Sequence, residues 1–375
     1  MSFKDADDED YDPEAELNAI ASEHGVTRDP LAEYEDLYRD KSPFRTWWHT
    51  TIADRDLADS TTEKYESHIQ AWIGHMEDQG RHPALPAPEH IRGYVETLRD
   101  DRGLAPDTIN GKLGPVIRAF DWFAGEAAFD AHAPDANLVR HVRDQVELSD
   151  SDPKEYPNLS LEEVREFVND INHIRDSLVV ALQLKLGLRA GTVSNIQLRD
   201  IHLGNNLHDH YTELGTHPEL AENGYEQAIH IPANRERTKS VNDRTLPLDG
   251  ELRQALTRYL LIRPDNGESA LILSMQRHTP VTYKSTTEIW NKQVRPKYPE
   301  TDSHRAVTSH FGRHFFSDFW AVEQDLNTHL VQYMRGDAVN TQNADDNSNG
   351  LDHYLHPEYE DVEEVYRERI YDLHL

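Results

Sequence analysis

The chain has 375 residues, a formal net charge of −31 and no cysteine. Its length allows two or three domains, each with its own hydrophobic core. The lack of cysteine excludes disulfides, catalytic thiolates and zinc sites with cysteine ligands. Residues 1–12 are acidic and lack the pattern of a signal peptide, and the longest apolar run, residues 177–188, is too short to cross a bilayer. We therefore expect a cytoplasmic protein that does not enter a membrane.

The acidic charge points to an unusual solvent rather than to an acidic ligand. Acidic residues outnumber basic ones 69 to 38, and only ten of the 38 are lysine. Such a composition is typical of proteins that work in molar salt. The screening length there falls to about 3 Å, so that net charge no longer opposes binding to DNA. We therefore expect a halophilic protein in which the local distribution of charge decides what is bound.

The first half of the chain contains an acidic segment and a predicted helical bundle. Residues 1–44 are expected to be partly disordered, because their first 40 residues carry 14 acidic side chains against three basic ones. Apolar residues then recur at helical spacing over residues 45–130. Helices are predicted to begin near Ser60, Pro88 and Pro106. Several amphipathic helices in so short a span make a small bundle.

Residues 131–158, rich in Asp, Ala and Pro, indicate a linker to a second domain, residues 159–375. Two short strands are expected at 227–232 and 245–248, on either side of a polar turn. The predicted helices of this domain cover residues 161–167, 176–188, 251–262, 307–322, 327–334 and 362–371. The fold class is therefore mainly α with a small β-sheet, as an N-terminal helical domain followed by an α+β domain.

Residues 308–320 carry the pattern H-x-x-R-H at the start of an apolar helix. His310 and Arg313 lie three residues apart and so share one face of the helix. Arginine offers a rigid fork of donors to a phosphate, and a nearby histidine can move a proton. Alone, this pattern is more typical of a solvent-exposed helix start. Two further basic residues favour a phosphate-binding site. Arg189 follows an apolar run, and Lys239 lies in the polar turn between the predicted strands.

With these residues the sequence resembles the tyrosine recombinases of the phage integrase family, over roughly residues 45–375. The first arginine lies in GLRAGTVSNIQL, and the tyrosine lies in LDHYLHP. Four motifs in the family's order make the resemblance specific. The residues that correspond to the family's catalytic set are Arg189, Lys239, His310, Arg313 and Tyr354.

The resemblance implies both a fold and a reaction. Residues 45–130 would be the core-binding domain and residues 159–375 the catalytic domain. The two arginines would neutralise the phosphate, Lys239 would protonate the leaving 5′-oxygen, and His310 would bind the phosphate or help to deprotonate the tyrosine. Tyr354 would form a 3′-phosphotyrosyl bond. This chemistry needs neither a metal ion nor another cofactor. The expected partner is double-stranded DNA, bound by a homotetramer.

The chain departs from the family pattern at three places. An acid usually stands three residues after the first arginine, where this chain has Thr192. The usual Leu-Gly-His or Leu-Gly-Trp box is replaced by Arg335-Gly336-Asp337, and we expect Asp337 to hydrogen-bond Arg313 or Lys239. A long polar loop, residues 342–350, leaves the register of the tyrosine open. Tyr354 is preferred because Leu355 and His356 follow it, and the alternatives are Tyr359, Tyr366 and Tyr371.

Positive charge gathers in two stretches, residues 232–248 and 276–298. The residues predicted to contact DNA are Arg235, Arg237, Arg244, Lys284, Lys292, Arg295 and Lys297. Two alternatives stay open. One is a DNA-binding protein that keeps the integrase fold but has lost strand exchange, which Thr192 and Asp337 favour. The other is a type IB topoisomerase, which shares the chemistry but would relax plasmid DNA as a monomer.

Overall fold

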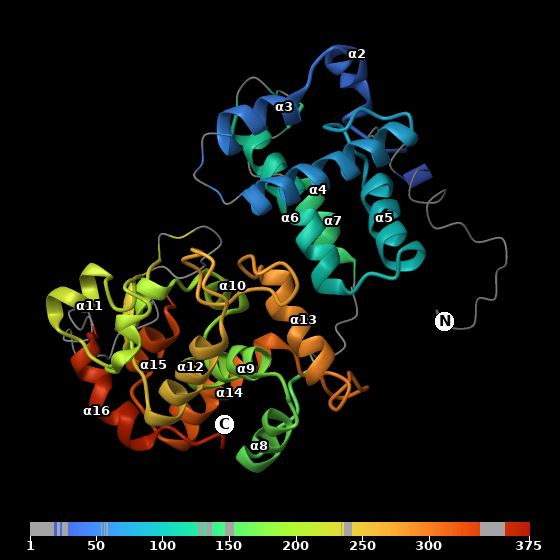
Figure 1. The fold of residues 1–375 in the computed structure, drawn as a ribbon. Helices are drawn as coiled ribbons and strands as arrows, with labels where there is room; N and C mark the ends of the chain where they lie inside the picture. The colour runs from blue at the N-terminus through green and yellow to red at the C-terminus, as the bar shows by residue number, and fades with distance from the viewer. Residues whose placement is uncertain are drawn as a thin grey trace, which may run out of the picture. The chain divides into compact units, whose positions relative to one another are not determined.

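The structure is a computed structural model that describes residues 19–20, 23–24, 29–53, 55, 57, 59–126, 129, 131–132, 137–146, 154–233, 235, 242–337 and 357–375. It divides into two compact units, Met1–Asp152 and Pro153–Leu375. Figure 1 shows the helical character of both and the short strands of the second. Among the described residues, no helix is both long and apolar enough to span a membrane.

The first unit is a helical bundle with an aromatic core. Trp72 and Phe120 are buried and meet edge to face, and Phe123 packs against Phe120 in the same way. Burial of such rings contributes both apolar area and ring–ring contacts. The helices of this unit are α2 (Glu35–Tyr38), α3 (Pro43–Trp47), α4 (Asp59–Asp78), α5 (Pro88–Glu96), α6 (Pro106–Gly125) and α7 (Leu138–Gln145).

Two predicted boundaries of this unit differ from the structure. The predicted linker, residues 131–158, contains α7, which buries Val139 and Val142 and is capped by the side chain of Asn137. The segment that was predicted to be partly disordered, residues 1–44, contributes Tyr38 to the core. In both cases a few apolar side chains at helical spacing outweigh the polar composition around them.

The second unit is built around α9 (Ile174–Leu186), whose residues from Leu178 to its end are all buried. Helices α8, α10, α12, α13 and α14 all pack against it. The remaining helices of the unit are α8 (Leu161–Asn169), α10 (Ala190–Asn195), α11 (Pro218–Asn223), α12 (Gly250–Ile262), α13 (Tyr283–Gln293), α14 (Ser309–Asp318), α15 (Thr328–Arg335) and α16 (Tyr359–Arg369).

The small sheet has three antiparallel strands in the order β1–β2–β3. They are β1 (Ile201–His202), β2 (Ala228–Ile231) and β3 (Arg244–Pro247). The register places Ile229 opposite both Ile201 and Leu246, and these three side chains join the core of the unit. The predicted fold class, mainly α with a small β-sheet, is thus confirmed.

Candidate active site

A tight turn after α9 places Arg189. The helix ends at Gly187, which has φ 60° in the left-handed region, and Arg189 is then the N-cap residue of α10. A Cβ atom at Gly187 would lie 2.6 Å from Cδ1 of Phe316 on α14. Glycine is therefore required here both for its backbone conformation and for the close approach of α14.

Arg313 lies on α14 and is almost completely buried, with 1% of its surface exposed. Its Nη1 donates to the carbonyl oxygens of Gly187 at 2.8 Å and Arg335 at 2.7 Å. Its Nη2 donates to Oδ1 of Asp337. These bonds tie the end of α9 and the end of α15 to one guanidinium group.

Asp337 joins the two arginines of the predicted site. Its Oδ1 accepts from Nη2 of Arg189 at 2.6 Å as well as from Arg313. Gly336 ends α15 in the left-handed conformation, so the carboxylate follows directly after a helix end. The expected contact between Asp337 and Arg313 is therefore present. Thr192 stands where the family usually has an acid, and its buried hydroxyl has no hydrogen-bond partner among the residues that the structure describes.

The electrostatics of the cluster keep Asp337 ionised and Arg313 protonated at neutral pH. Burial raises the pKa of Asp337, but Arg313, Arg335 and Arg189 outweigh burial and lower it below its ordinary value. Burial, and then the charge of Arg189, lowers the pKa of Arg313 to about 9, so that it remains cationic at neutral pH. The site thus holds several positive charges around one carboxylate.

His310 lies one helical turn before Arg313, on the first turn of α14. Its side chain is open to solvent, and its ring centroid lies 6.4 Å from that of Tyr156. Neighbouring atoms partly desolvate the ring of His310, and this desolvation, followed by the charge of Arg313, lowers the pKa of His310 below its ordinary value. The imidazole is therefore neutral at pH 7 and can accept a proton.

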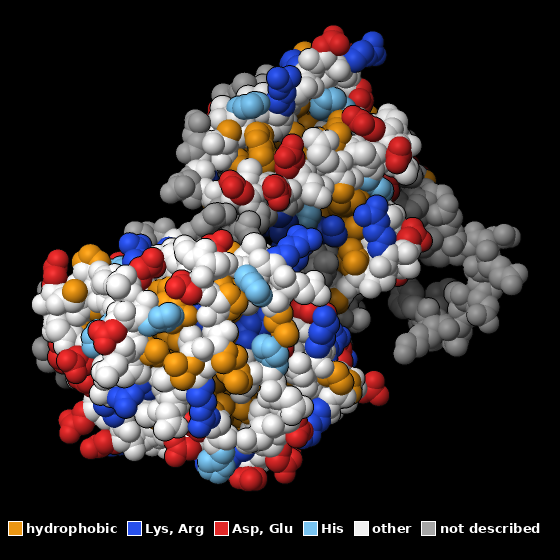
Figure 2. Space-filling model, in the orientation of Figure 1, with side chains coloured by type: hydrophobic (Ala, Val, Ile, Leu, Met, Phe, Trp, Pro, Cys, Tyr) orange, Lys and Arg blue, Asp and Glu red, His pale blue; other side chains and the backbone are white. Residues whose placement is uncertain are grey.

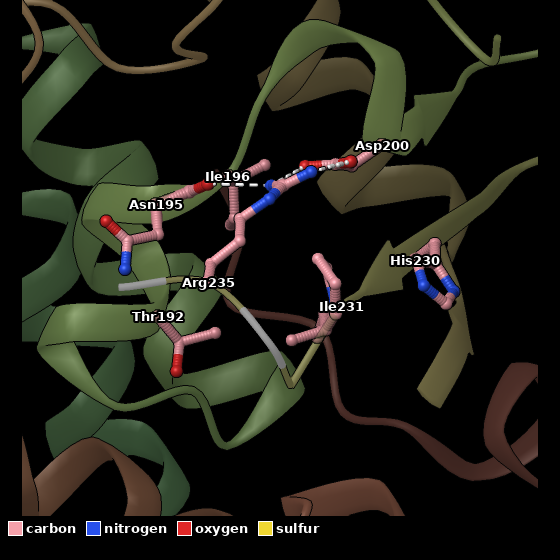
Figure 3. Close-up of a pocket in the computed structure, with 8 residues that line it drawn as sticks. Thr192, Asn195, Ile196, Asp200, His230, Ile231 and Arg235 are labelled. Atoms are coloured by element: carbon pink, nitrogen blue, oxygen red, sulfur yellow. Dashed lines mark hydrogen bonds and ion pairs between the residues drawn. The ribbon is translucent and has the colours of Figure 1, made fainter. Parts of the chain in front are cut away.

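Two arginines that were predicted to contact DNA are engaged inside the protein. Arg235 pairs with Asp200, which is fully buried, and also donates to the carbonyl oxygen of Asn195 at 2.8 Å (Figure 3). Arg244 on β3 is 3% exposed and donates through Nε to the carbonyl oxygen of Met334 at 2.9 Å. Arg235 therefore ties the segment after β2 to Asp200 and α10, and Arg244 ties β3 to α15. A buried charge must find its partner within the fold.

Four further predicted DNA contacts lie on or just after α13, and their side chains are exposed. Lys292 pairs with Glu288 at 3.2 Å, and Lys297 pairs with Asp170 at 3.4 Å. Exposed pairs of this kind are weak, so a phosphate could compete for either lysine. Lys284 and Arg295 are also exposed, and the contact of all four residues with DNA stays a prediction.

Three predicted residues, Arg237, Lys239 and Tyr354, lie outside the described residues. The alternative tyrosines are described, and each hydroxyl is hydrogen-bonded inside the fold. That of Tyr366 donates to the carbonyl oxygen of Lys185 at 2.8 Å, and burial raises its pKa well above the ordinary value. The hydroxyls of Tyr371 and Tyr359 bond to Leu184 and Glu363 respectively.

Comparison with known proteins identifies the second unit. Residues 157–338 match the phage integrase family, and this range includes both arginines and Asp337. The chain carries a phage integrase family domain. The match ends before Tyr354. No protein of curated function matches the sequence.

Solved integrase structures share the fold at low sequence identity. A fragment of lambda integrase, a dimer bound to a COC′ core site, has a TM-score of 0.54 and 13% identity, covering 82% of this chain and 99% of that one. The Tn1549 transposon integrase with a circular intermediate DNA has a TM-score of 0.55 and 16% identity, covering 85% and 95%. A lambda integrase tetramer bound to a Holliday junction has a TM-score of 0.54 and 14% identity, covering 89% and 84%.

One residue of the cluster, Arg335, was not among the predicted site residues. Arg335, in the last turn of α15, places Nε 3.0 Å from Oδ2 of Asp337. Its carbonyl oxygen also accepts from Arg313. A signal was available in the sequence, because Arg335 stands where the family box usually has leucine, but only the structure shows that it turns towards Asp337.

Proposed function

We propose that this protein is a site-specific DNA recombinase that cuts and rejoins duplex DNA through a 3′-phosphotyrosyl intermediate. The observation that carries the proposal is the convergence of Arg189 and Arg313 on one carboxylate oxygen, although they are far apart in the chain. Guanidinium groups that meet on a carboxylate can meet in the same way on a phosphate, since both offer charged oxygen acceptors.

The two arginines supply the electrostatic part of the reaction. The negative charge on the non-bridging oxygens rises in the transition state, and preorganised cations stabilise it without reorganising. Arg313 is held by three acceptors, so its orientation is set before DNA arrives. Because fixed guanidinium groups neutralise the phosphate, the proposed reaction requires no metal ion.

Tyr354 is the proposed nucleophile. Its oxygen attacks phosphorus, and the new phosphorus–oxygen bond forms as the bond to the 5′-oxygen breaks. The phenol proton passes to neutral His310, and Lys239 gives a proton to the departing 5′-oxygen. Attack by the 5′-hydroxyl of another strand on the phosphotyrosyl bond reverses these steps and rejoins the DNA. The internal hydrogen bonds of Tyr359, Tyr366 and Tyr371 support the choice of Tyr354.

The proposed partner is double-stranded DNA, and the proposed active assembly is a homotetramer on two DNA sites. The support is the common fold with integrases solved on DNA as a dimer and as a tetramer. Surface contacts would come from the exposed basic residues on and after α13. Such contacts to phosphate position the duplex but do not read its sequence.

A DNA-binding protein without strand exchange is the second candidate. Asp337 favours it, because an ionised carboxylate close to a phosphate is repulsive. The pairing of this carboxylate with both Arg189 and Arg313 opposes it, since it gives Asp337 a role within an intact cationic site. A type IB topoisomerase would instead relax supercoiled plasmid as a monomer.

A nicked suicide substrate tests the proposal. The duplex site would first be selected from a random library by binding to the protein. A nick close to the cleavage point then lets the short 5′ fragment leave and traps the protein on a DNA 3′ end. We expect an adduct that survives denaturing electrophoresis. Arg313→Ala should slow its formation by on the order of 100-fold, through lost charge stabilisation. Binding to the selected site without any adduct would favour the binding-only candidate.

A further inference from the structure

The arginines of the site keep buried N–H groups that donate no hydrogen bond in the described part of the protein. These atoms are Nη1 of Arg189, Nε of Arg313 and Nε of Arg335. Folded proteins satisfy nearly all buried donors, so three exceptions in one cluster need a reason. A ligand with several acceptor oxygens would supply the missing partners, and a phosphate is such a ligand.

Arg335 belongs to this cluster by position and by charge. Its Nε forms an ion pair with Oδ2 of Asp337, but without the geometry of a hydrogen bond. Its carbonyl oxygen accepts from Nη1 of Arg313, which places the backbone of Arg335 against the guanidinium group of Arg313. About a third of its side chain is exposed, so that the guanidinium group can be reached from solvent.

We propose that Arg335 is a third phosphate-binding arginine of this site and that Asp337 is its counter-ion. This inference rests on the proposed function. A lone carboxylate beside the scissile phosphate would repel it, whereas an arginine–aspartate pair is neutral and still offers donors to the phosphate. The usual family box has leucine and histidine or tryptophan at these two positions. The pair in this chain therefore replaces both residues together.

A simpler role for Arg335 would be to stabilise α15, since cations in the last turn of a helix interact favourably with its dipole. Arg369 provides a matched control, because it is exposed and also lies in the last turn of a helix, α16. Arg369→Leu removes the same charge from the same kind of position, far from the phosphate-binding cluster in the chain. If Arg335 only stabilised its helix, Arg335→Leu and Arg369→Leu should bind a phosphate-like anion equally well.

The first test uses tungstate, a phosphate-like anion, and needs no cleavage. Tungstate should raise the melting temperature of the full-length protein, because it binds the folded state at the arginine cluster. We expect Arg369→Leu to keep this shift and Arg335→Leu to lose most of it. Equal shifts in the unaltered protein and Arg335→Leu would overturn the proposal, whether or not the protein cleaves DNA.

The second test is a double-mutant cycle on cleavage of the suicide substrate at saturating DNA. Arg335→Leu removes one donor to the phosphate and leaves Oδ2 of Asp337 without the ion pair to Arg335, so that it should slow cleavage by on the order of 100-fold. Adding Asp337→His restores the usual family box and removes the repulsion. The double variant should therefore cleave within about tenfold of the unaltered protein, because coupled residues are not additive.

A double variant slower than Arg335→Leu alone would contradict the pairing of Arg335 with Asp337. An unaltered protein that forms no adduct would count against the proposed function instead. The tungstate titration would then still decide the role of Arg335.

Discussion

At the scale of single residues, Asp337 organises the site, because one carboxylate oxygen accepts from two guanidinium groups. Each hydrogen bond to a charged partner contributes about 1.5–3 kcal/mol when its geometry is good. Removing the carboxylate would leave the guanidinium groups of Arg189 and Arg313 less firmly oriented. We therefore expect Asp337→Ala to slow cleavage modestly, whereas faster cleavage would show that the carboxylate mainly repels the phosphate.

The pH dependence of stability offers a test of Asp337 that does not involve DNA. Burial raises its pKa, but Arg313, Arg335 and Arg189 lower it below the ordinary value overall. Its contribution is therefore complete above the unfolded pKa, about 3.9, and is lost as the pH falls through the lower folded pKa. The difference in unfolding free energy between the unaltered protein and Asp337→Asn should be constant from pH 7 to about 4 and shrink below that. A difference that shrinks between pH 7 and 5 would contradict the ion pairs.

Motifs in the sequence predicted which residues lie close together in the site. Arg189, Arg313 and Asp337 meet in the structure, and family order alone had placed them in one site. Arg235 was predicted to contact DNA because its neighbours in the chain are basic, and the structure pairs it with Asp200. Its partner, Asp200, is distant in the sequence, and nothing local to Arg235 predicts that pairing. Charge patterning indicates where cations are, but not which of them are already paired.

At the scale of secondary-structure elements, the contact between α9 and α14 positions Arg189 and Arg313. Gly187 ends α9 beneath Phe316 of α14, and its carbonyl oxygen accepts from Arg313. A side chain at residue 187 would therefore push the two helices apart and move an acceptor of Arg313. The same backbone turn carries Arg189 two residues later.

Gly187→Ala tests this contact, with Gly224→Ala as the matched control. Both glycines have positive φ at a helix end, but a Cβ atom at Gly224 would meet no atom within 4 Å. Gly224→Ala should cost about 1 kcal/mol of unfolding free energy, through backbone strain alone. Gly187→Ala should cost about 2–4 kcal/mol, because overpacking against Phe316 adds to the strain. Denaturant unfolding measures the loss of unfolding free energy in both variants. Equal losses would show that α14 moves away from the new methyl group without an energetic penalty.

Elements with a strong apolar pattern were predicted from the sequence, and an element with a weak one was not. The buried helix α9 and the paired strands β2 and β3 were expected close to their observed positions. Helix α7 was not expected, because it buries only Val139 and Val142 in a polar, acidic stretch. The side chain of its capping residue, Asn137, also donates a hydrogen bond to the carbonyl oxygen of Ile117 on α6. This tertiary contact cannot be predicted from the local sequence.

At the scale of the whole molecule, the charge is strongly acidic overall but locally mixed. On the face of the second unit seen in Figure 2, Lys and Arg side chains are scattered among acidic and neutral ones. A surface of this kind would repel DNA in dilute buffer, where charges act over long distances. In molar salt only contacts at close range count, since the screening length is about 3 Å.

Salt dependence tests the expectation of a halophilic protein. DNA binding usually weakens steeply with salt, because binding releases counterions from the phosphates. Here we expect folding, binding and cleavage all to persist in molar KCl, since acidic self-repulsion falls at the same time. Circular dichroism and DNA binding would be followed from low to molar KCl. Best folding and activity in dilute buffer, with loss at high salt, would contradict the expectation.

Tyr354 is the residue proposed to form the covalent bond to DNA, and peptide mapping of the trapped adduct identifies the tyrosine that does so. Tyr366→Phe serves as the control, because it loses a buried hydrogen bond to Lys185 and should cost stability of about 1–3 kcal/mol while leaving the adduct intact. We predict a phosphotyrosyl peptide that contains Tyr354, and no adduct from Tyr354→Phe despite unchanged DNA binding. A phosphotyrosyl peptide that contains Tyr359, Tyr366 or Tyr371, or an adduct that persists in Tyr354→Phe, would contradict the account.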